Sequence, residues 1–497
     1  MSPSVLETDG YKFSMAEAGW PLRQETFYYA HRRGPGPNGA SIVPFELEAF
    51  LRDLMPTSDA GDFAYLAGQD YEVGGGFKAA VADPRGKVAV TALPKGTWFL
   101  PREPVFSVTG PSALVSWLEP LALQLSYAIQ VATLALTDAD LLAREVATVT
   151  CDAQRQVILR TLDAVGVKAP AVAVDEEGYV ARVKAAAAEL ITIVGEPGRI
   201  FEVGLRAATC QRQHMLALEA LKSVGITRTS HVFGARALGL VPVGTMGHEH
   251  VQRFGSDEAA FRAMRDRRPG RSSYLLDTFD TVRSGIPSAL RLMTEENARG
   301  DSIRYDSGDK EAQYKFAIAR AKELGLRPVQ ILEDSFDAPL TKRFEDLRRE
   351  VGWQPHEQFY GYGGYLVAKT SGTSLTRDRV AAVYKLSQSA RTPTMKFGDE
   401  VADAGGGSGK QSVPGRPVVF RRLPGQPDGA PHGLIGQAGE APPPGYELLS
   451  GGAPHVAPPP PPPPPPGANQ HAVALSPATE LLVAPLRKAR AELLSAL

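Results

Sequence analysis

A regular alternation of short apolar runs with helical segments constrains the fold of this chain more than any other feature. The runs are rich in β-branched and aromatic residues, as strands are. They are 200–203, 231–233, 241–246, 274–276, 303–305, 329–332 and 359–360. Strand–helix alternation predicts a mainly parallel sheet, either open or closed into a barrel, and about seven such units favour a barrel.

Polar or glycine-containing clusters follow six of these segments. They are Gly204-Leu205-Arg206, Gly247-His248-Glu249-His250, Asp277-Thr278-Phe279-Asp280, Asp306-Ser307-Gly308-Asp309, Glu333-Asp334-Ser335 and Gly361-Tyr362-Gly363-Gly364. A helix N-cap explains any one of them, since Asp, Ser and Thr are preferred there. In barrels, however, reactive groups lie at the carboxyl ends of the strands. Six such ends together therefore indicate a functional site.

The residue types in these clusters suggest phosphate chemistry. Arginine guanidinium groups bind phosphates in bidentate fashion, and glycines let backbone N–H groups approach phosphate oxygens. Carboxylates beside phosphates bind Mg²⁺ or its waters, or accept from sugar hydroxyls. The histidine, His248, is a candidate general base or nucleophile, and its alternative role is that of a buried core histidine. The acids Asp277 and Asp306 favour the functional role.

Composition excludes several classes of protein. The net charge of −1 over 497 residues gives no basic surface for nucleic acid or an anionic membrane. Two cysteines, Cys151 and Cys210, are too few for a disulfide framework and match no metal-ligand spacing. No signal peptide and no run long enough to cross a bilayer is recognised. We expect a soluble, cytoplasmic globular protein.

The chain divides into four segments. Residues 1–135 predict an α+β domain, completed by about 380–425, and residues 136–379 predict the barrel-like catalytic domain. Residues 426–470 are rich in proline and glycine and are expected to be a flexible segment. Within them, Pro458–Pro466 must be polyproline II, either a passive spacer or a docking ligand. Residues 471–497 predict a helix that Pro485 kinks or restarts.

Several short motifs occur in an order that resembles one enzyme family. They are Thr8-Asp9-Gly10-Tyr11-Lys12, Glu202-Val203-Gly204-Leu205-Arg206, Gly244-Thr245-Met246-Gly247-His248-Glu249, Arg304-Tyr305-Asp306-Ser307-Gly308 and Leu375-Thr376-Arg377-Asp378. This order resembles the nicotinate and nicotinamide phosphoribosyltransferases, of the type II phosphoribosyltransferase family, over about residues 8–420. The resemblance implies an irregular α/β barrel together with a mixed α+β domain from the N-terminal and C-terminal segments.

The resemblance also implies an activity. The family transfers 5-phosphoribosyl from phosphoribosyl pyrophosphate (PRPP) to a pyridine nitrogen and releases pyrophosphate, in NAD salvage. By resemblance, ATP is a co-substrate that phosphorylates His248, Asp277 orients that histidine, and Asp306 lies at the ribose. Mg²⁺ is expected mainly through PRPP and pyrophosphate, with no protein metal ligand assigned.

The remaining site residues are likewise assigned by resemblance. Tyr11 is expected to stack on the pyridine from the partner subunit, so a homodimer with shared active sites is implied. Arg206 and Arg304 are expected at the pyridine and its neighbouring phosphate. The expected phosphate-binding positions are Gly363, Gly364 and Arg377.

The choice of base depends on Ser230. Nicotinamide enzymes resemble Gly-Thr-Asp-Thr at this turn, and an ionised aspartate there would repel a nicotinate carboxylate. A serine hydroxyl can donate to that carboxylate, so nicotinate is predicted; Ser230 as a helix cap is the structural alternative. Nicotinamide phosphoribosyltransferase is the rival activity. A degenerate homologue without turnover is a third hypothesis, because Glu333-Asp334-Ser335 stands where the family often has Ser-Gly-Asp.

Overall fold

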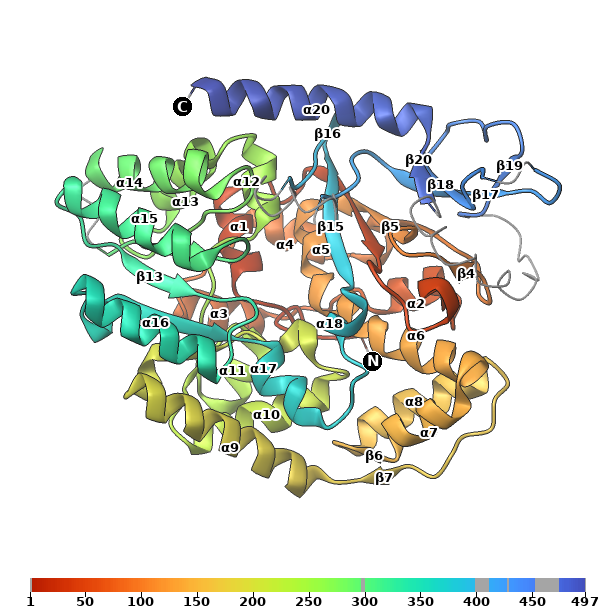
Figure 1. Cartoon of the computed structure of the whole chain (residues 1–497), viewed down its shortest axis with the longest axis horizontal. Coiled ribbons are helices and arrows are strands. Elements are labelled where there is room, and N and C mark those ends of the chain that lie inside the picture. The colour runs from red at the N-terminus through yellow and green to blue at the C-terminus, as the bar shows by residue number, and fades with distance from the viewer. Residues whose placement is uncertain (1, 296–299, 398–410, 427–428, 452–472, 497) are drawn as a thin grey trace.

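The computed structural model describes residues 2–295, 300–397, 411–426, 429–451 and 473–496. The predicted polyproline run, Pro458–Pro466, lies outside these residues. The described chain forms a parallel sheet with helices around it and an antiparallel sheet beside it (Figure 1). A smaller sheet and the long C-terminal helix complete the structure.

The parallel sheet carries the predicted strand–helix alternation. Its strand order is β10-β9-β8-β14-β13-β12-β11, with every neighbouring pair parallel. In chain order the strands are β8 (Ile200–Glu202), β9 (Arg228–Thr229), β10 (Val241–Pro242), β11 (Ser273–Leu275), β12 (Ser302–Tyr305), β13 (Val329–Leu332) and β14 (Gln358–Tyr362). β10 and β11 are its two edges, so the sheet is a curled, irregular half-barrel, which confirms the predicted fold class.

One predicted strand is wrong. Residues 231–233 were expected to be extended, but helix α11 (Val232–Leu238) begins there and the strand lies earlier, at β9. Val232 is fully buried in the helix, against the core of the antiparallel domain. Its burial outweighs the preference of a β-branched residue for a strand.

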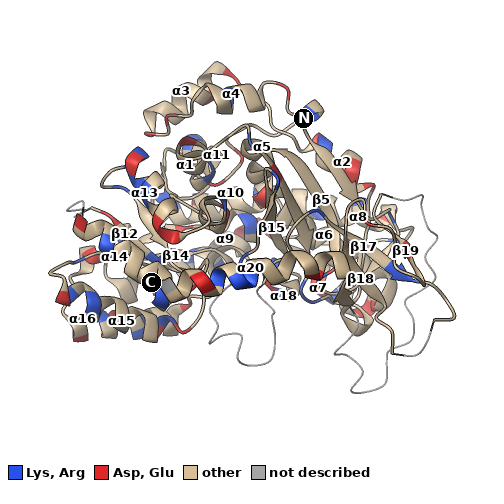
Figure 2. Cartoon of the chain, turned by 90° about the horizontal axis from the view of Figure 1, so that it is seen from above, with Lys and Arg blue, Asp and Glu red and all other residues tan. Residues whose placement is uncertain are grey.

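Helices cover the outer face of the half-barrel and bury its core. They include α9 (Glu176–Val194), α10 (Gln211–Ser223), α13 (Asp257–Arg267), α14 (Ile286–Glu295), α15 (Lys310–Glu323) and α16 (Ala338–Val351). Acidic and basic residues are interspersed along these outer helices, which agrees with the small net charge (Figure 2). Surface pairs such as Arg343–Glu311 and Arg262–Glu295 join neighbouring helices.

The antiparallel sheet joins the two ends of the catalytic region. Its order is β16-β15-β1-β5-β3, with β3 (Ala89–Ala92) and β16 (Thr392–Pro393) at the two edges. The first long strand, β1 (Gln24–Ala30), pairs with both β5 (Pro104–Pro111) and β15 (Val383–Ser389). The segment after residue 380 therefore enters the sheet built by the N-terminal residues.

A long apolar segment forms two helices, α5 (Ser112–Trp117) and α6 (Glu119–Thr137). Among the described helices, α6 is the one that is long and apolar enough to cross a membrane, but 83% of that window is buried inside the fold. It is therefore a core helix. Its Thr133 and Gln130 bond to the neighbouring backbone at Ile42 and Thr376.

The segment predicted to be flexible contains strands. β18 (Gly433–Gln437) and β19 (Tyr446–Leu448) pair with β17 (Pro417–Arg422), and β20 (Val473–Leu475) completes this four-stranded sheet. Glycine and proline dominate the local composition, yet Leu434 packs on Val418 and Phe420. The predicted C-terminal helix is α20 (Pro477–Ala496), and it continues through Pro485 without restarting.

A buried ion-pair network ties α9, β14 and α16 together. Arg199 bonds both carboxylate oxygens of Glu345 and donates to the carbonyls of Gln358 at 2.9 Å and Val194 at 2.8 Å. Arg199 and Glu345 side chains are each 3% exposed. Removing one partner of such a pair leaves an uncompensated buried charge.

We expect Arg199→Met to lower the free energy of unfolding by about 3 kcal/mol, because Glu345 is left with only Arg348 as a cation. Urea denaturation followed by circular dichroism measures the change. Arg349→Met is the control, since Arg349 pairs with Asp346 on the exposed face of α16 and such pairs contribute only about 0.5 kcal/mol. Equal shifts in the two variants would contradict the assignment.

Candidate functional site

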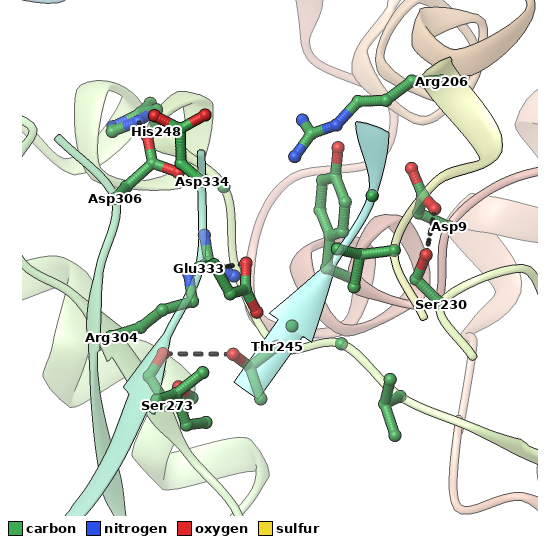
Figure 3. Close-up of a pocket in the computed structure, with 18 of the residues that line it drawn as sticks. Asp9, Arg206, Ser230, Thr245, His248, Ser273, Arg304, Asp306, Glu333 and Asp334 are labelled. Atoms are coloured by element: carbon green, nitrogen blue, oxygen red, sulfur yellow. Dashed lines mark hydrogen bonds and ion pairs between the residues drawn. The ribbon is translucent and has the colours of Figure 1, made fainter. Parts of the chain in front are cut away.

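A cavity of about 990 Å³ lies at the carboxyl ends of the parallel strands, between the half-barrel and the antiparallel sheet. Every site residue predicted from the sequence lines it, except Asp277. The lining residues include Tyr11, Arg206, Ser230, His248, Arg304, Asp306, Gly363, Gly364 and Arg377. Figure 3 shows His248 and Asp306 at one side of this pocket and Arg206, Asp9 and Ser230 at the other.

His248 begins helix α12 (His248–Phe254) and lies among polar partners from three other segments. Its Nδ1 is 3.0 Å from Thr278 Oγ1, and its Nε2 is 3.2 Å from Asp306 Oδ2. Asp277 Oδ1 lies 3.6 Å from the same Nε2. The Asp277 side chain is buried behind the cavity wall and accepts a hydrogen bond from Ser307. The three predicted catalytic residues therefore converge.

Lys396 completes this cluster, and sequence reasoning missed it. Its Nζ lies 2.8 Å from His248 Nε2 and 2.9 Å from Asp277 Oδ2. The ligand atoms of His248, Asp277 and Asp306 are close enough to one another to hold a metal ion, but the lysine ammonium already supplies a cation there. No strand-end pattern pointed to Lys396, because it lies beyond the strand–helix repeat.

The electrostatics of the cluster favour a neutral imidazole beside ionised carboxylates. Burial, and then the charge of Lys396, lower the pKa of His248. Burial tends to raise the pKa of both carboxyl groups, but their charged neighbours outweigh it. The charges of Lys396 and His248 lower the pKa of Asp277. The hydrogen bond with His248 and the charge of Lys396 lower the pKa of Asp306. In the neutral ring, Nδ1–H is donated to Thr278 Oγ1 and the Nε2 lone pair accepts from Lys396; the hydrogen bond from Nε2 to Asp306 belongs to the protonated ring. Such an imidazole is a competent nucleophile.

The C-terminal helix holds two segments of this cluster together. Arg490 of α20 donates to the carbonyl of Phe279 through Nε at 2.9 Å and Nη2 at 2.7 Å, and lies 3.6 Å from Asp280. Its guanidinium also stacks 5.4 Å from the ring centroid of Phe397. Phe279 follows Thr278 and Phe397 follows Lys396, so α20 positions both His248 partners. Figure 1 shows α20 crossing from the small sheet to the α14 side.

The opposite side of the cavity combines an aromatic ring with a cation. Tyr11 donates through its hydroxyl to Glu119 at 2.7 Å, and Arg206 lies 3.7 Å from the same carboxylate. The expectation was that Tyr11 would reach the site from a partner subunit. In this structure Tyr11 lines the pocket of its own chain, because α1 (Tyr11–Ala18) packs against the half-barrel.

Ser230 lines the cavity, and its predicted contact with a ligand carboxylate stays a prediction. Its hydroxyl donates to Asp9 Oδ1 at 2.6 Å, so its one hydrogen is engaged, and it makes no cap for α11. Burial raises the pKa of Asp9. Arg206 is consequently the group best suited to a ligand carboxylate. Its partner among the described side chains, Glu119, is beyond hydrogen-bond distance.

The glycine turn after β14 presents its backbone to the cavity. A Cβ on Gly364 would lie 2.8 Å from Asp378 Oδ2, and one on Gly363 would lie 2.9 Å from the carbonyl oxygen of Val203. Arg377 pairs with Asp378 at 3.0 Å beside this turn. Further basic residues that sequence reasoning missed line the same cavity, among them Arg32, Lys369 and Lys385. Burial and the charge of Lys396 lower the pKa of Lys385 to about 8.

The segment Glu333-Asp334-Ser335, which differs from the Ser-Gly-Asp of the resembled family, has an unusual backbone conformation. Asp334 and Ser335 have φ angles of 56° and 61°, which glycine adopts readily and other residues seldom do. Burial raises the pKa of Glu333, which lies 3.9 Å from Arg304. The turn therefore holds a left-handed conformation without glycine and brings an acid to the cavity wall.

Comparison with known proteins gives a consistent result. No family model matches the chain. A nicotinate phosphoribosyltransferase of Mycobacterium tuberculosis is 27% identical over 432 residues, covering 84% of this chain and 76% of the relative. The human nicotinate phosphoribosyltransferase is 26% identical over 422 residues, covering 73% and 65%.

Solved structures agree on the fold. The nicotinate phosphoribosyltransferase of Porphyromonas gingivalis superimposes with a TM-score of 0.57 at 18% identity, covering 80% of this chain and 95% of that one. The Vibrio cholerae enzyme gives 0.55 at 18% identity, covering 80% and 88%. The shared fold combines the irregular parallel half-barrel with the antiparallel domain. In sequence and in fold, the chain is thus similar to nicotinate phosphoribosyltransferases.

We expect Lys396→Met to raise the pKa of His248, because the nearby ammonium is one of the two causes that lower it. The folded protein would then bind the imidazole proton at higher pH. Histidine NMR titration of the labelled protein measures the change. Lys488→Met, on the exposed face of α20, is the control and should leave the titration unchanged. An unaltered His248 titration in both variants would contradict the proposed contact.

We expect Ser335→Gly to raise the free energy of unfolding by about 1 kcal/mol, because glycine relieves the left-handed backbone. Ser335→Ala is the matched control: it removes the hydroxyl but keeps the Cβ, so it should not stabilise. Thermal unfolding of the three proteins measures the difference. Stabilisation by alanine equal to that by glycine would rule out backbone strain as the cause.

Proposed function

We propose that this protein is a nicotinate phosphoribosyltransferase that transfers 5-phosphoribosyl from PRPP to nicotinate, coupled to ATP hydrolysis, in NAD salvage. One observation carries the proposal: a single cavity joins a partly buried nucleophilic histidine, a glycine turn with basic neighbours, and an aromatic–arginine end. These three parts match the needs of phosphoryl transfer, PRPP binding and pyridine binding.

The glycosyl transfer uses the centre of the cavity. The pyridine nitrogen attacks the anomeric carbon of PRPP, and the bond from that carbon to the pyrophosphate oxygen breaks. Positive charge develops on the ribose in the transition state, and the Asp306 carboxylate, kept ionised by His248 and Lys396, stabilises it. The pyrophosphate leaves toward the basic residues Lys385 and Arg377.

His248 would couple ATP to this step. Its neutral Nε2 attacks the γ-phosphorus of ATP, the bond to the bridging oxygen of ADP breaks, and a phosphohistidine forms. Thr278 fixes the ring by bonding Nδ1, and Lys396 lies beside Nε2 where it can stabilise the transferred phosphoryl group. Asp277 acts through Lys396, with which it shares a 2.9 Å contact.

Mg²⁺ fits this site as a companion of the phosphates. Asp277 is buried and already bonded to Lys396 and Ser307, so it is not available to a diffusible ion. Asp306 faces the cavity, and it is the carboxylate of the cluster that could contact a hydrated ion carried by PRPP or pyrophosphate. When bound, the ion would neutralise the charge that develops on the leaving pyrophosphate.

Nicotinate is favoured over nicotinamide because Arg206 supplies a cation for the pyridine carboxylate. Asp9, beside Ser230, is the acceptor that nicotinamide as the rival base would use. The proposal includes a cytoplasmic location and a homodimer. Tyr11 of the same chain already lines the pocket.

We expect Arg206→Met to raise KM for nicotinate about 100-fold, since a charged hydrogen bond pair contributes up to about 3 kcal/mol. Steady-state assays with nicotinate and with nicotinamide, each with PRPP and ATP, measure it. Arg212→Met, exposed on α10, is the control. Faster turnover of nicotinamide than nicotinate by the unaltered protein would overturn the base assignment, and binding of PRPP without turnover of either base would identify a degenerate homologue.

We expect His248→Ala to abolish incorporation of the γ-phosphoryl group of ATP into the protein, because the attacking nitrogen is removed. Labelled ATP and acid-lability of the phosphoprotein measure the incorporation. His250→Ala is the control: His250 lies two residues away, faces the carbonyl of Ala260 and does not line the cavity. Persistent labelling of His248→Ala would show that another residue accepts the phosphoryl group.

A further inference from the structure

The two cysteines of the chain lie side by side, although 59 residues separate them in sequence. Cys151 Sγ and Cys210 Sγ are 3.7 Å apart, and the chain contains no other cysteine. Cys151 is buried and Cys210 is partly exposed. Neither takes part in the proposed phosphoribosyl transfer, so their contact needs a separate explanation.

Both cysteines lie in the same local motif, Thr-Cys-x-x-Gln. In Thr150-Cys151-Asp152-Ala153-Gln154, Gln154 Oε1 accepts from the Thr150 amide at 2.9 Å and hydroxyl at 2.7 Å. In Thr209-Cys210-Gln211-Arg212-Gln213, Gln213 Oε1 accepts from the Thr209 amide at 2.7 Å and hydroxyl at 3.1 Å. The sequence thus builds the same turn twice, and each turn aims one sulfur at the other.

Each cysteine is the N-cap of a 13-residue helix. Cys151 precedes α8 (Asp152–Ala164) with φ −163° and ψ 164°, and Cys210 precedes α10 with φ −162° and ψ 165°. Two positive helix ends therefore converge on the two sulfurs, which favours a thiolate. The hydrogen bond with Cys210 lowers the pKa of Cys151 to about 7.

A metal ion explains the pair less well than a covalent bond. Structural zinc needs four ligands. Among the residues that the structure describes, the metal-competent cluster of three or more His, Cys, Asp or Glu is the one at His248, and it does not include the sulfurs. Two thiols in contact, one of them activated, are what disulfide formation requires.

We propose that Cys151 and Cys210 form a reversible intramolecular disulfide when a peroxide oxidises the protein. A thiolate of the pair attacks one peroxide oxygen, the O–O bond breaks, and a sulfenic acid and hydroxide form. The second thiolate then attacks the sulfenyl sulfur, the S–S bond forms, and hydroxide leaves. With the two thiol protons, the products are one disulfide and two waters; the peroxide is reduced and the sulfurs are oxidised.

The disulfide would tie the start of α8 to the loop that carries Arg206. This loop runs from the end of β8 through η4 (Leu205–Ala207) to Cys210, and Arg206 lines the cavity. The other partner, α8, packs on the core helix α6. Oxidation therefore fixes the Arg206 loop to the core without adding any group to the cavity.

Mass spectrometry of the full-length protein before and after peroxide treatment tests the bond. We expect both thiols to lose reactivity toward an alkylating agent, the intact chain to lose two hydrogen atoms, and one cross-linked peptide to contain Cys151 and Cys210. A thiol reductant should restore both thiols. Sulfinic or sulfonic acids without the cross-link, a disulfide between two chains, or unchanged alkylation would each overturn the proposal.

Hydrogen exchange of residues 204–209 tests the tether. We expect exchange to slow several-fold on oxidation and to recover on reduction, and we expect Cys151→Ser to show no response to peroxide in this loop. If that variant does not fold, the oxidised and reduced forms of the unaltered chain provide the same comparison. Disulfide formation with unchanged exchange would overturn the tether. None of these readouts uses catalytic activity, so they stand apart from the test of the proposed function.

Discussion

The contact of Lys396 with His248 and Asp277 is the interaction on which the site depends. It places one ammonium between an imidazole and a buried carboxylate that would otherwise be uncompensated. It also joins two parts of the fold, because His248 and Asp277 come from the half-barrel and Lys396 follows the antiparallel sheet. The chemistry therefore requires that the two sheets be docked.

The C-terminal part of the chain supports the polar cluster around His248. Arg490 reaches from α20 to the loop of Asp277 and to the ring beside Lys396. The small sheet that anchors α20 is built from a region whose composition suggests only a linker. A segment remote in sequence thus holds the residues of the polar cluster in position. Supporting residues of this kind keep reacting groups close to their productive geometry.

Different sides of the cavity carry different kinds of chemical group. The Arg206 side offers a cation and an aromatic ring, the glycine turn offers backbone and basic side chains, and the His248 side offers a nucleophile. The strained turn at Asp334 and Ser335 lies on the wall shared by these parts. Strain of this kind concentrates at functional sites, where the surrounding structure holds a conformation that the residues disfavour.

By itself the sequence determined the half-barrel and the convergence of His248, Asp277 and Asp306, because strand–helix alternation puts successive strand ends at one edge of a sheet. It could not reveal Lys396, Lys385 or Arg490, which reach the cavity or its wall from outside that repeat. It also could not show that Ser230 is committed to Asp9, or that Cys151 meets Cys210. Such pairings depend on how distant segments dock, and only the tertiary structure decided them.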